Sequence, residues 1–374
     1  MSVVSSRPTP DTPASQTAPA TRATVGHGAI EWPTVAVAAV LYAGFGLITW
    51  HHQQLPWWLV ALLGGYLVAW HGSLQHEVIH GHPTPWPRLN RALVWPVLWL
   101  WCPYEIYRES HERHHETEVL TDPERDPESF YVSPAAWDRM GTLRRTLLVA
   151  HNSLLGRLLL GPPVVVARLA AAELPLLLGG DRARLRLWAA HALSVAAVLA
   201  WVRGVCGIPV IEYVLLFVYP AISFTLLRSY AEHSAAPVEE RRTACVECAP
   251  PLALLYLNNN LHLMHHSEPW LPWYRLPSRW RERRAQLLGA SASHPYAGYL
   301  EVFRHHLLRV REPVRWPLAG AGGGKPAHVP VGGASLVAAV HFAQAPHGDG
   351  AIGEAERADA ERSTGPGRQR GKRR

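Results

Sequence analysis

Eight histidines in three short clusters are the residues of this 374-residue chain whose type and spacing point most directly to chemistry. The clusters read His-Glu-Val-Ile-His at residues 76–80, His-Glu-Arg-His-His at 111–115 and His-Leu-Met-His-His at 262–266. Spacings of three and four residues place side chains on one face of a helix. Neutral imidazole is a common ligand of iron, zinc and copper. Since a tetrahedral zinc site uses four ligands, eight imidazoles predict two metal ions.

The elements that must position these clusters are apolar. Hydrophobic residues make up 48% of the chain and are concentrated in blocks between polar ends. Short links at 51–55 and 203–207 join the blocks in pairs. We therefore predict an all-α integral membrane protein, with four transmembrane helices in two hairpins and a helical cap that holds the metal site. Each predicted span is near the roughly 20 residues that cross a hydrocarbon core: residues 34–50, 56–74, 187–202 and 208–227.

The predicted spans also predict a topology. Four spans place both termini and all three clusters on one side of the membrane. The long loops on that side are rich in arginine, whereas Arg203 is the only cation in the 203–207 link, so the positive-inside rule makes the cluster side cytoplasmic. We expect a multi-pass protein of the bacterial inner-membrane type. Residues 143–178 mix Leu and Val with Arg and Pro, which favours helices on the membrane surface but leaves a further span open.

Composition sets the domain boundaries. Residues 1–30 and 316–374 are rich in small residues and proline, and both are predicted to be disordered, without a signal peptide. One membrane domain is expected over residues 31–315.

The formal net charge of the chain is +7. Its arginines flank apolar runs, which indicates contact with lipid headgroups rather than with nucleic acid. Cys245 and Cys248 form a lone CxxC, a weak indication of a redox or metal site.

The clusters resemble the three histidine boxes of the membrane fatty acid desaturase and hydroxylase superfamily. The likeness covers roughly residues 34–300 and includes the order and spacing of the boxes and the spans between the second and third. Residues 228–233 (Arg-Ser-Tyr-Ala-Glu-His) and 258–262 (Asn-Asn-Asn-Leu-His) are similar to bacterial fatty acid desaturases. The resemblance implies two non-haem irons that use molecular oxygen and two external electrons to attack an unactivated C–H bond.

The resemblance also implies the ligands. Family desaturases use one more histidine just after the fourth span, where His233 stands. Some relatives have an asparagine one helical turn earlier, where this chain has Ser229, and the triple at 258–260 is the candidate substitute. The implied ligand set has nine members: His76, His80, His111, His114, His115, His233, His262, His265 and His266.

Carboxylates near these histidines would offset the metal charge and orient the rings. Four glutamates lie within two residues of a candidate ligand: Glu77, Glu112, Glu232 and Glu268. Asp122 and Asp126 follow the second box and fit either this role or turn formation beside proline. His82 is a candidate ligand or substrate contact. The remaining histidines, including His71 and His191, have no partner at ligand spacing with a cluster.

The expected substrate is a lipid or other long acyl chain, because a metal site at the ends of membrane spans suits a molecule that enters from the bilayer. The sequence has no haem-binding segment or flavin fingerprint, so we expect a separate electron donor such as a ferredoxin or rubredoxin. A basic run past the third box could dock it or contact lipid headgroups: Arg279, Arg281, Arg283 and Arg284.

Three other functions stay open on sequence alone. The same iron site can hydroxylate or ketolate an alkane, carotenoid or lipid. Residues 76–80 match the HExxH motif of a zinc protease, with Glu77 as general base, although one zinc leaves at least five clustered histidines unused. A metal transporter would place its site near the bilayer midplane, whereas these histidines lie at the ends of spans.

Overall fold

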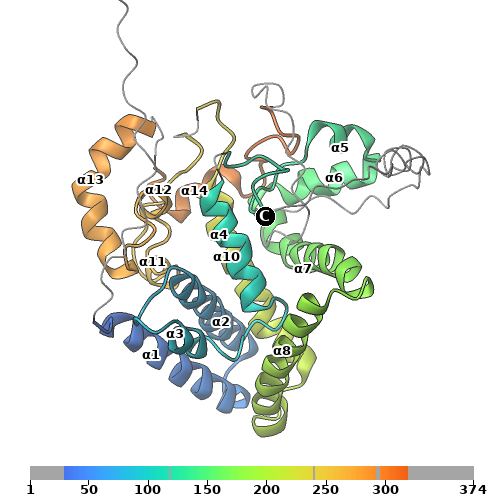
Figure 1. The fold of residues 1–374 in the computed structure, drawn as a ribbon, viewed down its shortest axis with the longest axis vertical. Coiled ribbons are helices and arrows are strands. Elements are labelled where there is room, and N and C mark those ends of the chain that lie inside the picture. The colour runs from blue at the N-terminus through green and yellow to red at the C-terminus, as the bar shows by residue number, and fades with distance from the viewer. Residues whose placement is uncertain (1–28, 118, 239–240, 292–294, 319–374) are drawn as a thin grey trace, which may run out of the picture. The chain divides into compact units, whose positions relative to one another are not determined.

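The computed structural model describes residues 29–117, 119–238, 241–291 and 295–318. The two predicted disordered segments lie almost entirely outside these residues. Within them every regular element is helical, and the extended segments form only isolated bridges. The predicted all-α fold is therefore confirmed (Figure 1).

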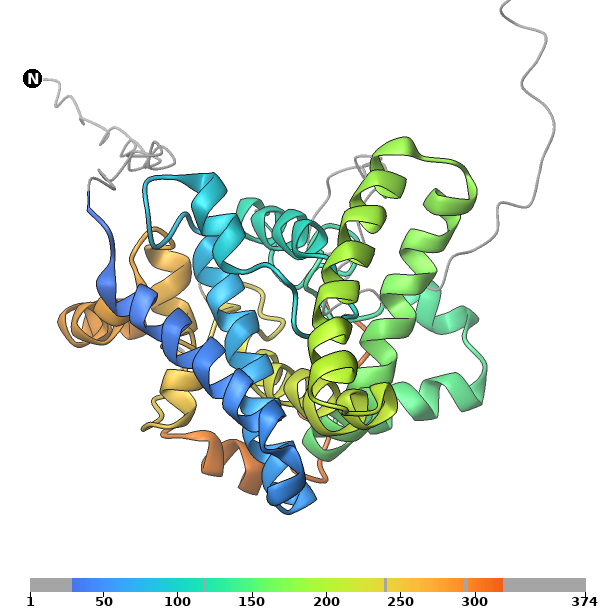
Figure 2. The same ribbon diagram turned by 90° about the horizontal axis from the view of Figure 1, so that it is seen from below.

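Among the described residues, five helices are long and apolar enough to cross a membrane. The first two are α1 (Trp32–Trp50) and α2 (Trp57–Ile79), which lie side by side as the predicted hairpin (Figure 2). The second predicted hairpin is also present. It consists of α8 (Arg182–Leu199), continued by a π-helical turn at Ala200–Val205, and of α9 (Val210–Tyr213), a π-helical segment at Val214–Val218 and α10 (Tyr219–Glu232).

The two hairpins meet where α2 carries adjacent glycines. A Cβ atom at Gly64 would lie 2.5 Å from the ring of Phe217, and one at Gly65 would lie 2.5 Å from Pro220. Small residues at these positions let the helix backbones approach closely, as in other membrane helix pairs. This contact brings the end of α10 beside the end of α2, where the first histidine box lies.

The region predicted as surface helices forms α6 (Thr142–His151) and α7 (Leu154–Leu178). The latter is the fifth helix long enough to span a bilayer, and it lies beside α8 (Figure 2). Three prolines and two buried arginines, Arg157 and Arg168, interrupt its apolar sequence. Length and composition alone therefore do not decide whether α7 crosses the membrane.

The remaining elements surround the histidines. The short α3 (Pro87–Leu93) leads into a buried loop, in which the Leu98 carbonyl accepts a hydrogen bond from the Tyr213 hydroxyl at 2.8 Å. The cap helices are α4 (Tyr104–Glu116), α5 (Pro134–Arg139), α11 (Leu252–Leu255), α12 (His262–Ser267), α13 (Leu276–Ser291) and α14 (Tyr299–His306), with a 3-10 turn at Trp273–Arg275. A second 3-10 turn, His52–Gln54, joins α1 to α2 at the other end of that hairpin.

Candidate metal centre

Four parts of the chain supply the predicted ligands. His76 is in the last turn of α2 and His80 caps that helix, and the second and third boxes lie on α4 and α12. His233 follows α10 in an extended conformation, because the Glu232 carbonyl accepts a hydrogen bond from the Ala244 amide instead of continuing the helix. The structure brings all nine predicted histidines together in two groups that share His115 as a neighbour.

The second group contains His114, His233, His262 and His266. Their Nε2 atoms form a closed ring, with separations of 3.1 Å from His114 to His233, 2.9 Å from His233 to His262, 3.1 Å from His262 to His266 and 3.2 Å from His266 to His114. Two nitrogens that bind one ion at about 2.1 Å, at right angles, lie about 3.0 Å apart. The spacing is therefore that of ligands around one ion.

The contacts of the other ring nitrogen, Nδ1, show why a cation fits this group. The Nδ1–H of His114 donates to Asp126 at 2.8 Å, and that of His233 donates to the Arg242 carbonyl at 3.1 Å. The Nδ1 of His262 lies 3.1 Å from the Asn259 Oδ1 atom. A neutral imidazole has one N–H, so in their neutral forms these three rings direct unprotonated Nε2 atoms at one another. Such lone pairs repel unless a cation lies between them.

The first group contains His76, His80, His111 and His265. The Nε2 atoms of His80 and His111 are 3.1 Å apart, and the His115 Nε2 atom lies 3.1 Å from that of His111 and 3.0 Å from that of His265. His115 is therefore a fifth nitrogen donor for this group. Its ring also stacks on His266 of the second group, with centroids 4.5 Å apart.

Burial favours the neutral, metal-binding form of most of these rings. Burial is the largest cause that lowers the pKa of His115, His262 and His265 well below the ordinary value, and it lowers the pKa of His233 to about 3. Burial would also lower the pKa of His114, but the carboxylates of Asp126 and Glu128 outweigh it and raise that pKa to about 9. A metal ion bound to Nε2 would replace the proton that these carboxylates stabilise.

The carboxylates predicted from sequence divide into two sets. Asp126 contacts His114, and Glu232 lies 3.3 Å from the Nδ1 atom of His262 while it also pairs with Arg228 at 3.0 Å. Glu77 is 3.8 Å from His76 and accepts the Trp273 amide hydrogen, so it orients the loop after the third box. The other predicted carboxylates pair with arginines instead: Glu112 with Arg108, Asp122 with Arg125, and Glu268 with Arg279 and Arg283.

Sequence reasoning missed Glu128 as a partner of the site. Its carboxylate accepts from the Nδ1–H of His111 at 3.0 Å, and the charges of His114 and His111 hold its pKa below the ordinary value despite burial. Asp126 and Glu128 both lie in the loop after α4, where the Glu128 amide donates to Asp126 at 2.8 Å. The Asp-Pro-Glu pattern at 126–128 was the available signal, but it is equally typical of a turn.

The asparagine triple has one member in the site. Asn259 is buried, with its Nδ2 atom 3.2 Å from His76 of the first group and its Oδ1 atom at His262 of the second. Asn258 and Asn260 bond to the backbone carbonyls of Trp273 and Val246. Ser229 bonds to the Leu226 carbonyl within α10. Asn259 is therefore the asparagine that lies between the two groups.

The doubtful histidines and cysteines lie outside both groups. His82 pairs with Glu31 at 2.7 Å, and His191 bonds to the Leu100 carbonyl. Both cysteines of the CxxC are free thiols, and Cys245 is packed against Trp280 and Met264. In the predicted basic run, Arg279, Arg283 and Arg284 form ion pairs with glutamates, so little of its charge is unopposed.

The fold and the site together define a helical membrane protein with two histidine groups suited to metal ions. A model of the fatty acid desaturase family matches residues 53–297, which include all nine histidines. The chain therefore belongs to the fatty acid desaturase family, whose members are oxidoreductases. A comparison with curated proteins finds no match.

Proposed function

We propose that the protein is an oxygen-dependent desaturase of a long acyl lipid, with two irons held by the nine histidines. The observation that carries the proposal is the convergence of histidine ring nitrogens in two adjacent groups. Family membership supports the reaction class. One ion would bind the first group and His115, and the other would bind the second group.

Bound iron would supply the oxygen chemistry that removes two hydrogens from neighbouring carbons. The substrate, one O2, two electrons and two protons give one alkene and two waters, so atoms and electrons balance. The chain's own residues hold the ring orientations through Nδ1 and place Asp126, Glu128 and Glu232 against the excess positive charge of the site. Histidines suit this task because they are neutral ligands, so the bound ions keep their positive charge.

We infer that four helices cross the membrane and that α7 does not. Three candidate spans lie between His115 and His233, yet these histidines meet at one centre, so only an even number of those helices can cross. The start of α7 lies at the histidine side, where the Tyr230 hydroxyl donates to the Asn152 carbonyl. Its end lies there too, because Glu173 bonds to Trp188 near the start of α8.

The contacts of α8 support the same topology. Arg184, in its first turn, pairs with Glu109 on the second-box helix at 2.9 Å, whereas Trp201 near its other end donates to Thr49 at the end of α1. It therefore crosses from the histidine side to the opposite side, and α9–α10 returns. We propose that the histidine side is cytoplasmic, as its arginine-rich loops favour.

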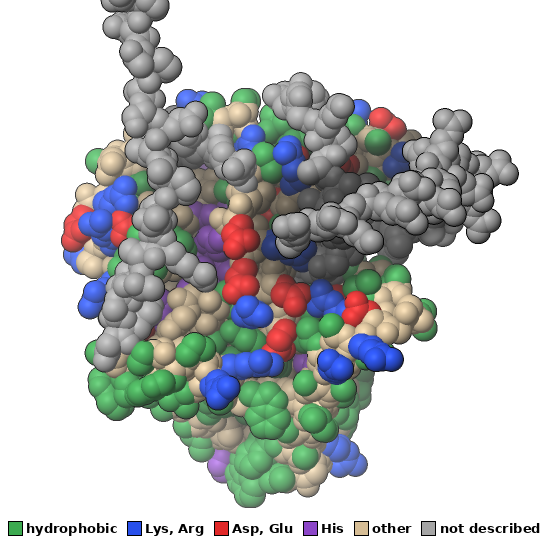
Figure 3. All heavy atoms as spheres, viewed as in Figure 1, with side chains coloured by type: hydrophobic (Ala, Val, Ile, Leu, Met, Phe, Trp, Pro, Cys, Tyr) green, Lys and Arg blue, Asp and Glu red, His purple; other side chains and the backbone are tan. Residues whose placement is uncertain are grey.

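We further propose that electrons come from a separate protein such as a ferredoxin or rubredoxin. Histidine side chains reach the face drawn in Figure 3, between α13 and α4, and arginine and glutamate side chains gather over α4 beside them. His115 and His266 are half-buried, so the centre is near the surface on this side. A mixed-charge face suits a brief, orientated encounter with a small redox protein.

Expression in a bacterial host that also supplies a ferredoxin and its reductase tests the reaction. Mass spectrometry of total lipids should show new double bonds that are absent with the His265→Ala variant. A product heavier by one oxygen would make the protein a hydroxylase, and one reproducible zinc without iron in the purified protein would overturn the metal assignment. Cysteines at exposed Arg182 and Arg203 test the topology: we expect labelling from opposite sides, with Arg182 on the cytoplasmic side.

A further inference from the structure

Arg157 is a charged residue for which the proposed chemistry has no use. It lies in the first turn of α7, and only 1% of its surface is exposed. The guanidinium stacks on the ring of Phe130 at 4.4 Å and lies 5.7 Å from the ring of Tyr230. Its hydrogen bonds go to neutral groups, the His151 carbonyl at 3.4 Å and the Asn152 side-chain oxygen at 3.3 Å.

No negative charge compensates Arg157 among the residues that the structure describes. It has no ion pair there, and its Nη1 atom has no hydrogen-bond partner. The nearby ring of His151 also has a buried Nε2 atom without a partner. An uncompensated buried charge strongly destabilises the folded state, so this site calls for an anion.

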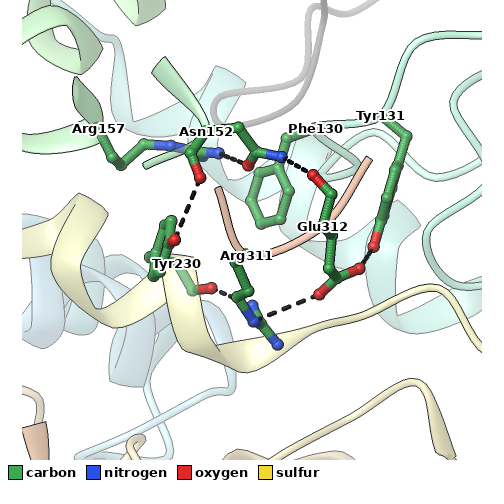
Figure 4. Close-up of a pocket in the computed structure, with 7 residues that line it drawn as sticks. All are labelled: Phe130, Tyr131, Asn152, Arg157, Tyr230, Arg311 and Glu312. Atoms are coloured by element: carbon green, nitrogen blue, oxygen red, sulfur yellow. Dashed lines mark hydrogen bonds and ion pairs between the residues drawn. The ribbon is translucent and has the colours of Figure 1, made fainter. Parts of the chain in front are cut away.

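A small cavity lies beside the guanidinium (Figure 4). Its lining comes from α7, α10, the loop after the second box and the segment after α14. The space holds about one water-sized group. Seven residues line it: Phe130, Tyr131, Asn152, Arg157, Tyr230, Arg311 and Glu312.

The one carboxylate in the lining is engaged elsewhere. Glu312 pairs with Arg311 at 3.3 Å and accepts a hydrogen bond from the Tyr131 hydroxyl (Figure 4). Burial raises the pKa of Glu312 to about 7, so near neutral pH this group is only partly charged. Two arginines therefore face the cavity against at most one negative charge.

We propose that this cavity binds a small inorganic anion, of the size of chloride, on Arg157. The anion would join the start of α7 to α10 and to the segment after α14. It would act close to the metal centre, because Arg311 of the same lining donates to the carbonyl of His233 at 3.1 Å. A neutral water would accept the hydrogen bond from Arg157 but would not compensate its charge.

Chloride titration of the purified full-length, metal-loaded protein tests this site. The ionic strength is held constant with gluconate, which is too large for the cavity. We expect saturable broadening of the 35Cl NMR line and a matching rise in the thermal unfolding temperature. Replacing Arg157 with Gln should weaken chloride binding at least tenfold, whereas Arg281→Gln, an exposed arginine on α13, should leave it unchanged.

Two results would overturn the proposal. Absence of a saturable chloride response in the wild-type protein would mean that a water accepts the remaining hydrogen bond of Arg157. This result does not depend on whether any variant folds. An equal response in wild type and Arg157→Gln would mean an adventitious ion only. If Arg157→Gln does not fold, Arg157→Lys retains a charge in place of the forked guanidinium and should still bind chloride, but more weakly than wild type.

Discussion

The two histidine groups contain similar ligands but differ in what holds them. In the second group three rings have a partner at Nδ1: the Asp126 carboxylate, the Arg242 carbonyl and the Asn259 amide. In the first group, among the described residues, His111 is the one ring with a hydrogen-bond partner at Nδ1, the Glu128 carboxylate at 3.0 Å, and the Nδ1 atom of His76 lies 3.8 Å from Glu77. Ring orientation is therefore fixed in advance in the second group and depends more on the ion in the first.

This difference predicts unequal affinities. A partner that fixes the tautomer and orientation of a ligand typically changes metal affinity by about 10–100-fold. We expect the second group to retain its ion longer when a chelator is added, and the first to lose its ion earlier. Iron content and the spectroscopic signature of the paired ions, followed during chelation, should show two phases. A single phase would mean that the groups bind their ions as one unit.

The largest effects should come from removing a ligand. His265→Ala should remove the first ion and His262→Ala the second, so that each variant holds about one iron and no desaturated product is detected. His191→Ala is the matched control, because this buried histidine bonds a backbone carbonyl away from both groups. Two irons in either ligand variant would contradict the grouping.

Removing a carboxylate should have a smaller effect that is confined to one group. Asp126→Asn should weaken the second ion and Glu128→Gln the first, by about 10–100-fold in metal affinity. Glu112→Gln should change neither, since this glutamate pairs with Arg108 on the outer face of α4. Competition with a chelator at fixed pH measures each affinity. Equal loss of both ions in Asp126→Asn would show that the loop at 126–128 supports the centre as a whole.

The sequence predicted the metal ligands more completely than the residues that hydrogen-bond to them. Histidine spacing alone identified eight of the nine residues that converge, since a three- or four-residue spacing fixes which side chains share a helix face. Glu128 and Asn259 could not be assigned in this way, because their contacts depend on how a loop and a left-handed turn fold back across the chain. Glu112 and Glu268 lie beside ligands in sequence but pair with arginines instead.

The same limit applies to the membrane helices. Hydrophobic length identified four spans whose contacts agree with their predicted pairing, but it could not decide the role of α7, which has sufficient length and apolar character. Our proposal that α7 does not cross rests on parity, because His115 and His233 meet at one centre, and on the contacts at the two ends of α7. Contacts between residues distant in sequence therefore carried information that the local pattern of α7 lacks.

Acid should destabilise the metal-free protein, because histidines of both groups have lowered pKa values in the folded state. His233, His262 and His265 have folded-state pKa values below the ordinary 6.5, so the unfolded chain binds more protons as pH falls below that value. Each such group destabilises the folded state by up to about 1.4 kcal/mol per pH unit, which is tenfold in the folding equilibrium. Thermal unfolding of the chelated protein between pH 7 and 5 should show this loss.

His114, a member of the second group, should have the opposite pH dependence. Its folded-state pKa is raised to about 9, so its stabilising contribution is complete below pH 6.5 and is lost as pH rises through 9. Wild type and His114→Asn, both metal-free, should differ most below pH 6.5 and converge above 9. A constant difference across this range would mean that Asp126 does not stabilise a charged imidazole.

The smallest effect should come from the residue that touches both groups. Asn259→Ala removes one hydrogen bond to His262 and one contact to His76. A hydrogen bond contributes about 0.5–1.5 kcal/mol net, so the affinity for each ion should fall about 2–13-fold. Asn260→Ala is the control, because this neighbour is also buried but bonds the Val246 carbonyl. Since Asn259 lies between the groups, its loss should also reduce the difference in chelation rate between them, whereas a purely structural role would leave their ratio unchanged.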